Sequence, residues 1–382
     1  MVLSTTIFKV LGLFPVKIEA MKVLGIETSC DETAVSVCEL KDGLVNMLSN
    51  TVVSQIDIHK AYGGVIPEIA ARSHIEAIIP TVDDSLETAF GSDKTQNAWD
   101  NIDAIAVTYG AGLGGALLIG SLTARGLAIA KSKPLYACNH VEGHVYANFV
   151  TSSPLQNYTL PERAPRFPFL ALIVSGKHSQ VVIFRDHFDY TVLGITRDDA
   201  IGEAFDKVAK IIGLPYPGGP SISKSAQAGD AYAYHFPKAK LDELYEFSFS
   251  GLKTAVLRTA QEAIGEDFTF PSFEIAGRLT DAQRSDIAAS FQRVAVETVV
   301  DKAVRACDEF RPNSVVIAGG VAANLELRRQ LADRLPVQPQ YTDIKLCTDN
   351  GAMIATLGCY KAMLGSEQTN PMSLQIQPTL RM

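Results

Sequence analysis

The sequence predicts an α/β protein made of two halves of similar order. In each half, short apolar runs typical of strands precede a glycine-rich turn and a helical stretch, and a proline-rich segment at residues 153–168 separates the halves. A chain of 382 residues, 47 % hydrophobic and 20 % charged, is long and apolar enough for two ordinary domains and is neither disordered nor a coiled coil. Ligands of open α/β sheets bind beyond the carboxyl ends of the strands, so we expect a cleft between the halves.

The first half is expected to contain its elements in the order βββαβα. Short apolar or alternating runs predict the strands. These strands are residues 23–26, 33–40, 45–54 and 104–107. One helix is predicted from Pro67, a residue favoured in the first turn, to Pro80. Another follows the glycines at 110–115 and ends near Lys131.

The second half repeats this order. Its predicted strands are residues 169–174, 180–184, 190–193 and 314–318, and its predicted helices are 200–212, 284–309 and 325–335. The last of these strands ends in Gly319 and Gly320, so this half is also built from strand, glycine turn and helix.

Charge and cysteine content restrict the classes of partner and site. The 34 Lys and Arg against 42 Asp and Glu give a formal net charge of −8, so a nucleic-acid partner would need a local basic patch or a helper protein. The six cysteines are scattered without a C-x-x-C pair. This pattern indicates a reduced protein that uses thiols as small core residues, rather than a zinc site or a disulfide frame.

Residues 1–20 differ from the rest of the chain. Their apolar stretch, residues 10–16, is broken by Pro15 and is far shorter than the ~20 residues of a membrane span, and the sequence predicts no span elsewhere. We expect a dispensable N-terminal extension that is disordered or not native, with a cleaved organellar or secretory leader as the alternative.

Two histidines in His140-Val-Glu-Gly-His144 would share one face of a helix and could bind one metal ion. The alternative is that both only cap and pack the start of a helix. A zinc protease would need its glutamate directly after the first histidine, whereas Glu142 comes two residues later and is expected to point away. Asp349 could supply a third ligand or act only as an N-cap. Such a set of two histidines and one aspartate would suit iron or zinc equally.

Glycine-rich turns next to predicted strand ends and helix starts suggest a nucleotide site, because backbone N–H groups there can approach a phosphate. They are Gly112-Leu-Gly-Gly115, Ser175-Gly176, Pro217-Gly-Gly-Pro220 and Gly319-Gly320. Ser175-Gly176-Lys177 is similar to the end of a P-loop, but Ala171 stands where that motif needs its first glycine, and His178 where it needs Ser or Thr. A P-loop is therefore excluded.

Taken together, these segments resemble the TsaD family of tRNA threonylcarbamoyladenosine synthesis proteins, once described as glycoproteases. Eight strings between about residues 21 and 360 carry the resemblance, in the family's order. They are Gly25-Ile-Glu-Thr-Ser-Cys-Asp-Glu-Thr33, Tyr62-Gly-Gly-Val-Ile-Pro-Glu68, His140-Val-Glu-Gly-His144, Asp198-Asp-Ala-Ile-Gly-Glu-Ala-Phe-Asp-Lys207, Tyr216-Pro-Gly-Gly-Pro220, Phe247-Ser-Phe-Ser-Gly-Leu-Lys253, Ala318-Gly-Gly-Val-Ala-Ala-Asn324 and Cys347-Thr-Asp-Asn-Gly-Ala352. Two positions depart from the family's pattern: Lys177 replaces a glycine of Ser-Gly-Gly-His-Thr, and Ala111 replaces the proline of Gly-Pro-Gly.

The resemblance implies an actin-like ATPase (ASKHA) fold, with two ribonuclease-H-like lobes around a central cleft. Lobe I would comprise residues 21–150, completed by a C-terminal helix at 350–364, and lobe II residues 151–349. The implied reaction transfers a threonylcarbamoyl group from threonylcarbamoyl-AMP to the exocyclic amine of adenosine 37, in tRNAs reading codons that begin with A, and releases AMP.

The family's motifs also imply site residues by their position. One divalent metal ion per subunit, iron or zinc, would be held by His140, His144 and Asp349. The adenylate, or ATP or AMP in its place, would contact Ile173, Val174, Ser175, Gly176, Lys177, Asp206, Gly219 and Asn324. Glu27, in the turn after the first strand, is a candidate proton acceptor for the amine, or else a structural partner to its loop.

The implied partners are tRNA and either a paralogous protein with a small ATPase, as in bacterial relatives, or a second copy of the chain, as in mitochondrial relatives. A cytoplasmic location without a membrane partner is expected, with a mitochondrial one as the alternative. A nucleotide-binding metalloprotease is a rival function, which the position of Glu142 opposes. A phosphotransferase of the same fold would normally carry an Asp-x-Gly-Thr turn where this chain has Ile26-Glu-Thr-Ser29. A non-enzymatic scaffold that binds nucleotide is the third rival.

Overall fold

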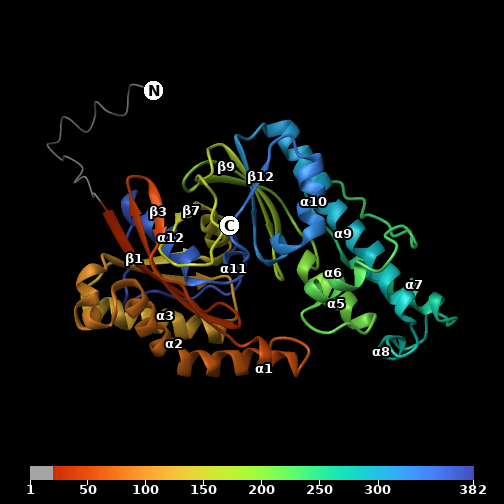
Figure 1. Ribbon diagram of the computed structural model, residues 1–382, viewed down its shortest axis with the longest axis horizontal. Coiled ribbons are helices and arrows are strands. Elements are labelled where there is room, and N and C mark those ends of the chain that lie inside the picture. Colours follow the sequence, from red (N-terminus) through yellow and green to blue (C-terminus); the bar gives the residue numbers. More distant parts are fainter. Residues whose placement is uncertain (1–19) are drawn as a thin grey trace.

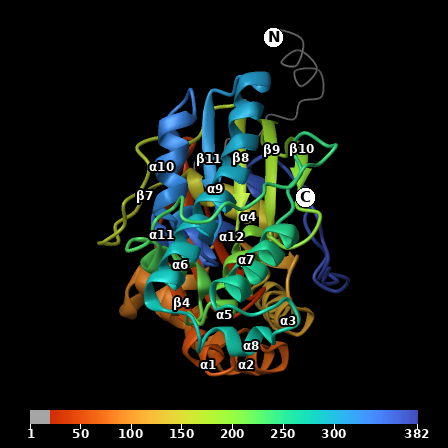
Figure 2. The same cartoon turned by 90° about the vertical axis from the view of Figure 1, so that its right-hand side faces the viewer.

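The computed structural model describes residues 20–382. The N-terminal extension expected at residues 1–20 therefore lies, apart from Ala20, outside the described residues. Two β-sheets, each covered by helices, stand side by side, one built from residues 20–152 and one from residues 169–341 (Figure 1, Figure 2). None of the helices in this part of the chain combines the length and apolar character that a membrane crossing requires.

The first sheet has seven strands in the order β6-β5-β1-β2-β3-β7, with β4 also paired to β2. They are β1 (Ala20–Glu27), β2 (Glu32–Lys41), β3 (Leu44–Met47), β4 (Thr51–Ser54), β5 (Ala104–Gly110), β6 (Leu135–Asn139) and β7 (Val150–Ser152). β5 runs parallel to both β1 and β6, whereas the β1–β2 and β2–β3 pairs are antiparallel. The carboxyl ends of β1, β5 and β6 therefore meet at one edge of the sheet.

The single strand predicted over residues 45–54 is wrong, because the structure has two strands there, β3 and β4, which both pair with β2. Between them, the Ser49 hydroxyl accepts a hydrogen bond from the backbone N–H of Val37 at 2.9 Å. The Ser49 carbonyl accepts another from the hydroxyl of Ser36. These side-chain bonds replace the regular ladder, so the chain leaves β2 after β3 and returns to it at β4.

The second sheet has five strands in the order β10-β9-β8-β11-β12. They are β8 (Phe169–Val174), β9 (Ser179–Asp186), β10 (Asp189–Ile195), β11 (Ser314–Ala318) and β12 (Pro339–Tyr341). β8 is buried along its whole length. Leu170 and Leu172 pack in a core within the second half, whereas Ala171 and Ile173 pack in a core that includes Val23 of the first half. A shared apolar core therefore joins the two halves.

Helices cover both faces of the first sheet. α2 (Pro67–Phe90) and α3 (Gly114–Lys131) pack on one face, and α4 (His140–Tyr146) and α12 (Gly351–Met363) pack on the other. α12 comes from the C-terminal end of the chain but contacts β1, β2 and β5. It lies so close to β1 that a Cβ on Gly25 would be 2.2 Å from the backbone nitrogen of Ala355.

The helix that begins at Pro67 does not end at Pro80, as the sequence predicted, but continues to Phe90. Ile78, Val82 and Leu86 are buried at four-residue spacing, while Pro80 is exposed. The apolar stripe that packs on the sheet therefore stabilises the helix beyond the proline, which stands on the solvent side.

The remaining helices lie mainly around the second sheet. They are α5 (Ile201–Ile211), α6 (Gly218–Ala226), α7 (Ser250–Ala263), α8 (Ser272–Ile275), α9 (Asp281–Phe310), α10 (Leu325–Arg334) and α11 (Ile344–Cys347), with α1 (Ile56–Lys60) in the first half. α9 starts at a capping box, in which Thr280 accepts from the backbone of Gln283 and the Gln283 side chain binds the Thr280 backbone. The predicted helices 200–212, 284–309 and 325–335 are confirmed as α5, α9 and α10.

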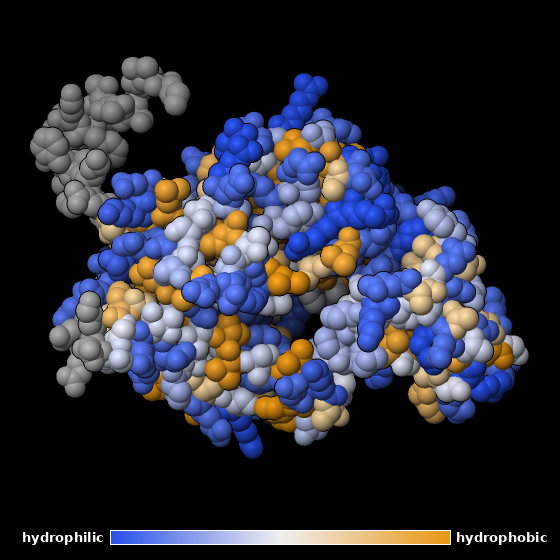
Figure 3. All heavy atoms as spheres, viewed as in Figure 1, coloured by the Kyte–Doolittle hydropathy of each residue, from blue (hydrophilic) through white to orange (hydrophobic). Residues whose placement is uncertain are grey.

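The carboxyl ends of strands from both sheets meet between the two halves. β1 leads to Cys30, and β8 leads to Lys177 of the other half, whose Nζ lies 3.1 Å from the Cys30 Sγ. Cys30 is partly exposed, whereas the other five cysteines are buried. A hollow in the surface at the junction of the halves is visible in Figure 3.

Candidate functional site

Two histidine rings lie together on one side of α4. Asn139, the last residue of β6, caps this helix by accepting hydrogen bonds from the N–H groups of Val141 at 2.8 Å and Glu142 at 3.3 Å. The helix thus begins directly at the strand end. The centroids of the His140 and His144 rings are 4.7 Å apart, and both side chains are buried.

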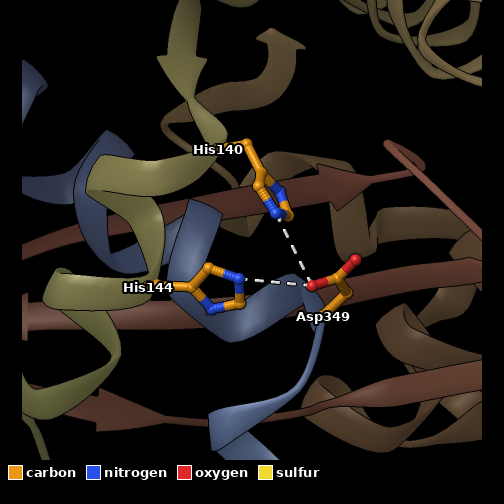
Figure 4. A group of neighbouring side chains, drawn as sticks. All are labelled: His140, His144 and Asp349. Carbon is orange, nitrogen blue, oxygen red and sulfur yellow. Dashed lines mark ion pairs between the residues drawn. The ribbon is translucent and has the colours of Figure 1, made fainter. Parts of the chain in front are cut away.

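Asp349 reaches these rings from the turn between α11 and α12. Its Oδ1 lies 3.3 Å from the Nε2 of His144 and 3.6 Å from the Nε2 of His140 (Figure 4). The N-cap of α12 is the next residue, Asn350, which accepts from the backbone of Met353 at 3.0 Å. Asp349 therefore does not cap α12, which was the alternative role that the sequence left open.

The donor set of this cluster fits a divalent metal ion. One ligand atom from each of His140, His144 and Asp349 lies within 4.8 Å of the others. Burial alone would lower the pKa of His140, but the carboxylates of Asp349 and Glu27 outweigh it and raise this pKa to about 9. Burial would raise the pKa of Asp349, yet His140, His144 and Lys177 hold it well below its usual value. The site is therefore arranged to hold positive charge among carboxylates.

Glu27 contacts His140 from the side opposite Asp349. Its Oε2 lies 3.2 Å from the His140 Nδ1 and accepts from the Thr108 hydroxyl at 2.5 Å, while its Oε1 accepts from the N–H of Ser29 at 2.5 Å. The side chain is fully buried, and although burial raises the pKa of Glu27, His140 brings it below its usual value. Both oxygens are engaged, so the geometry favours the structural role that the sequence left open over that of proton acceptor for an amine.

Glu142 lies apart from this cluster. Burial raises the pKa of its carboxyl to about 6, and the charge that opposes this shift is that of Lys361, not of either histidine. Glu142 stands two residues from each histidine along α4, so its side chain projects from the opposite side of the helix, as the sequence predicted. The arrangement of a zinc protease, with a glutamate beside the metal ligands, is not formed by this residue.

The turn after β8 is closed by its own hydrogen bonds. The Ser175 hydroxyl accepts from the backbone N–H of Lys177 at 3.3 Å and of His178 at 3.0 Å. Gly176 is exposed, and a Cβ there would meet nothing within 4 Å. Ile173 and Val174, in contrast, are fully buried within β8 and their side chains pack in the core, so their contact with an adenylate stays a prediction that only their backbone could fulfil.

Lys177 reaches from the second half to Cys30 of the first half. Its Nζ donates to the Cys30 Sγ, and burial, which would lower the pKa of this lysine, is outweighed by Cys30, Asp349 and Asp31, so that the pKa is raised. The side chain that replaces a family glycine thus links the two halves close to the metal-ligand cluster.

Asp206 binds the start of α6, one residue before Gly219. The Asp206 Oδ1 accepts from the N–H of Gly218 at 2.7 Å, and its other oxygen makes no hydrogen bond within the described chain. Burial raises the pKa of this carboxyl. A Cβ on Gly219 would meet nothing within 4 Å, so its backbone is open to a ligand at the helix N-terminus.

The Asn324 side chain makes hydrogen bonds with both its oxygen and its nitrogen inside the folded chain. Its Oδ1 caps α10 by accepting from the N–H of Leu327 at 2.9 Å. Its Nδ2 donates to the Ser223 hydroxyl at 3.0 Å and to the Gln292 Oε1 at 2.9 Å. Both amide hydrogens of Asn324 are therefore bound to neighbouring side chains, and its contact with an adenylate stays a prediction.

Three side chains that the sequence interpretation did not assign also lie by the cluster. Asp31 and Glu32 follow β1, and burial, Asp349 and Asp31 together raise the pKa of Glu32 well above its usual value. The His178 ring lies 6.2 Å from the His140 ring, and its buried Nδ1 has no partner in the described part of the chain. Burial and the neighbouring histidines lower the pKa of His178 to about 3. The acidic turn after the first predicted strand was the sequence feature that could have identified Asp31 and Glu32.

The sequence model of the family described as TsaD, tRNA N6-adenosine threonylcarbamoyltransferase, matches residues 46–356. A protein of that name from Thermomicrobium roseum is 46 % identical over 352 residues, covering 90 % of this chain and 93 % of its own. One from Caldicellulosiruptor saccharolyticus is 45 % identical over 361 residues, covering 94 % and 97 %.

Solved structures with a similar fold include two HypF proteins. The HypF from T. kodakarensis has a TM-score of 0.53 at 13 % identity, with 93 % of this chain and 49 % of that chain covered. A full-length HypF solved in a phosphate- and nucleotide-bound form has a TM-score of 0.51 at 14 % identity, with 92 % and 47 % covered. This likeness confirms the α/β, actin-like ATPase fold that the sequence predicted.

Proposed function

This chain belongs to the TsaD family of tRNA N6-adenosine threonylcarbamoyltransferases, and we propose that it transfers the threonylcarbamoyl group of threonylcarbamoyl-AMP to the exocyclic amine of adenosine 37. Its substrates would be tRNAs reading codons that begin with A, and AMP would be released. The observation that carries the proposal is the convergence of His140, His144 and Asp349 at the junction of the two halves, next to turns open to a nucleotide.

The metal-ligand cluster would supply the electrophilic part of the site. His140, His144 and Asp349 would hold one divalent ion, iron or zinc, which when bound polarises a substrate oxygen and stabilises the negative charge that develops as the amine attacks. AMP is a good leaving group, so no covalent nucleophile on the protein is required. The chain mainly has to hold the two substrates in line and exclude water.

The adenylate would lie along the second half of the cleft. The free oxygen of Asp206 is placed to accept from a ribose hydroxyl, and the open backbone at Gly219 and Gly176 can approach the nucleotide closely. Ser175 would shape the turn, and Lys177 would place a positive charge near the phosphate, from its position beside Cys30. ATP or AMP would occupy the same site. Asn324 would support the wall through Ser223 and Gln292.

Glu27 would act as a positioning residue for His140. A histidine that ligates a metal usually donates its other ring N–H to a carboxylate, which fixes the tautomer and the ring orientation. The Nδ1 of His140 lies 3.2 Å from the Glu27 Oε2 and 3.0 Å from the Ser29 hydroxyl, and a hydrogen on this atom leaves the Nε2 lone pair facing Asp349. The hydrogen bonds from Ser29 and Thr108 hold the Glu27 carboxylate in place for this task.

Protein partners would bind the outer face of lobe I. Large apolar side chains are exposed at spacings of four or seven residues on α2 and α3, which pack against each other. They are Ile75, Ile79, Leu118, Leu122 and Ile129. Such a face suits a paralogous partner protein, with a small ATPase joining the assembly, or a second copy of the chain. A cytoplasmic location would bring the enzyme to its tRNA.

Purified chain, incubated with threonylcarbamoyl-AMP and unmodified tRNA, tests the function. Nucleosides from the tRNA are analysed by mass, with and without the candidate partner proteins. The proposal expects threonylcarbamoyladenosine from the wild type and at least a 100-fold lower yield from Asp349→Ala. The matched control is Asp333→Ala, which removes an exposed carboxylate that pairs with Arg329. Failure of the wild type to modify tRNA under every condition would contradict the proposal.

A further inference from the structure

A cavity of about 480 Å³ opens between the two halves, beside the proposed adenylate site. Tyr62 and Gly63, in the loop after α1, form one wall, and Asp206, Lys210 and Tyr216, from α5 and the loop that follows it, form another. Figure 1 and Figure 2 both place α5 next to α1. The mechanism proposed above uses only Asp206 of this lining, so the two tyrosines and the lysine are unassigned.

Within the described chain, no side-chain hydrogen bond accounts for Tyr62 and no ion pair accounts for Lys210. The Tyr62 side chain is 60 % exposed, and its hydroxyl makes no hydrogen bond within the described chain. Lys210 is exposed and forms no ion pair there, unlike Lys238, which pairs with Glu297 and Asp301. The cavity thus combines two phenol rings from opposite halves with the ammonium group of Lys210 and the carboxylate of Asp206.

The cavity adjoins the proposed adenylate site. Tyr216 lines it together with Asp206, whose Oδ1 accepts from the N–H of Gly218. Burial, Asp206 and Asp31 raise the pKa of the Tyr216 hydroxyl. A molecule in the cavity would therefore lie beside Asp206, which also binds the backbone of the adenylate turn at Gly218.

We propose that this cavity receives the acceptor adenine of the RNA, turned out of its loop and stacked on Tyr62 and Tyr216, with Lys210 near its backbone phosphate. The inference rests on the proposed function and adds the place of its second substrate. A base that reacts at its exocyclic amine must leave the stack to reach an enclosed site. Proteins hold such unstacked bases on aromatic rings and bind the flanking phosphates with basic side chains. Walls from both halves and the exposed Tyr62 ring leave the cavity accessible to a polymer.

Binding of an anticodon stem-loop RNA with 2-aminopurine at the acceptor position tests this inference without requiring turnover. The fluorescence of the wild-type complex is expected to report stacking of that base on the protein. Tyr62→Ala should weaken RNA binding roughly 5- to 150-fold, the range for loss of one stacked base, and should remove the fluorescence change. Tyr62→Phe keeps the ring and should bind RNA within about twofold of the wild type. Tyr232→Ala, at an exposed tyrosine outside the cavity lining, is the matched control.

Two further measurements separate the acceptor from the donor. AMP affinity should be the same in Tyr62→Ala and the wild type, whereas equal losses of AMP and RNA binding would place the donor in the cavity and overturn the inference. Lys210→Ala should reduce the slope of log affinity for RNA against log salt by about 0.7, as expected for loss of one phosphate contact. Unchanged RNA affinity and fluorescence in Tyr62→Ala would also refute it. A wild type that binds RNA this way but modifies none would count against the proposed function, not against the cavity.

Discussion

Replacing Glu27 by glutamine should weaken metal binding without unfolding the chain. Glu27 is fully buried, its Oε2 lies 3.2 Å from the His140 Nδ1, and three donors surround its two oxygens. A glutamine keeps the shape of Glu27 but replaces one carboxylate oxygen by an NH₂ group. This group would face either the N–H of Ser29, or the Thr108 hydroxyl and the His140 Nδ1, all of which are donors to the carboxylate. In the second case the His140 proton moves to Nε2, the atom that faces Asp349.

The loss of such an orienting carboxylate typically costs 10- to 100-fold in metal affinity, or about 1.4–2.7 kcal/mol. Zn²⁺ affinity, measured by competition with a chelating dye, should fall by this factor in Glu27→Gln. The matched control is Glu142→Gln, which removes a buried carboxyl on α4 that lies apart from the ligand cluster, and its Zn²⁺ affinity should stay within about twofold of the wild type. Unchanged Zn²⁺ affinity in Glu27→Gln, combined with lost transfer activity, would refute the positioning role and favour a direct part in proton transfer.

Three further predictions concern stability and assembly. Gly25→Ala should lower the free energy of unfolding by roughly 2–4 kcal/mol in chemical denaturation, because its Cβ would meet the backbone of Ala355 at 2.2 Å, whereas Gly126→Ala, at an open position, should not destabilise the chain. Burial lowers the pKa of His187 to about 4, below the ~6.5 of an unfolded chain, so acid favours the unfolded state. The free energy of unfolding should therefore fall by about 1–2 kcal/mol between pH 7 and 4, after allowance for partial exposure. A His187→Phe variant that loses as much stability over this pH range as the wild type would show that His187 is not the cause. Leu122→Glu should abolish binding of the paralogous partner, or dimerisation, in light-scattering measurements, and wild-type assembly would show that α3 is not the contact.

Local patterns were sufficient to predict most strands and the paired histidines. The apolar run 169–174 could only be a buried strand or part of a buried helix, and its short length favoured the strand that the structure contains as β8. The four-residue spacing of His140 and His144 likewise placed both rings on one side of α4. Such features depend on residues that are close in the sequence.

Features that depend on distant contacts could not be derived in this way. The packing of α2 on the sheet overrides the helix-breaking tendency of Pro80, and only the folded chain shows which of its faces is buried. The hydrogen bond between Glu27 and His140 joins residues 113 positions apart. The commitment of Asn324 to Ser223 and Gln292, and the reach of Lys177 to Cys30, also depend on tertiary placement. Motif matching suggested which residues gather at the cleft, but not which of their atoms remain free.

The central claim is that a metal ion and an adenylate lie side by side in the cleft between the two halves. Nuclear relaxation of AMP in the presence of protein loaded with Mn²⁺ tests it directly, because a paramagnetic ion accelerates the relaxation of nearby nuclei. We predict strong enhancement for the ³¹P nucleus of AMP with the wild type, and loss of that enhancement with His144→Ala while AMP still binds. AMP that binds the Mn²⁺-loaded wild type with unenhanced ³¹P relaxation would contradict the account.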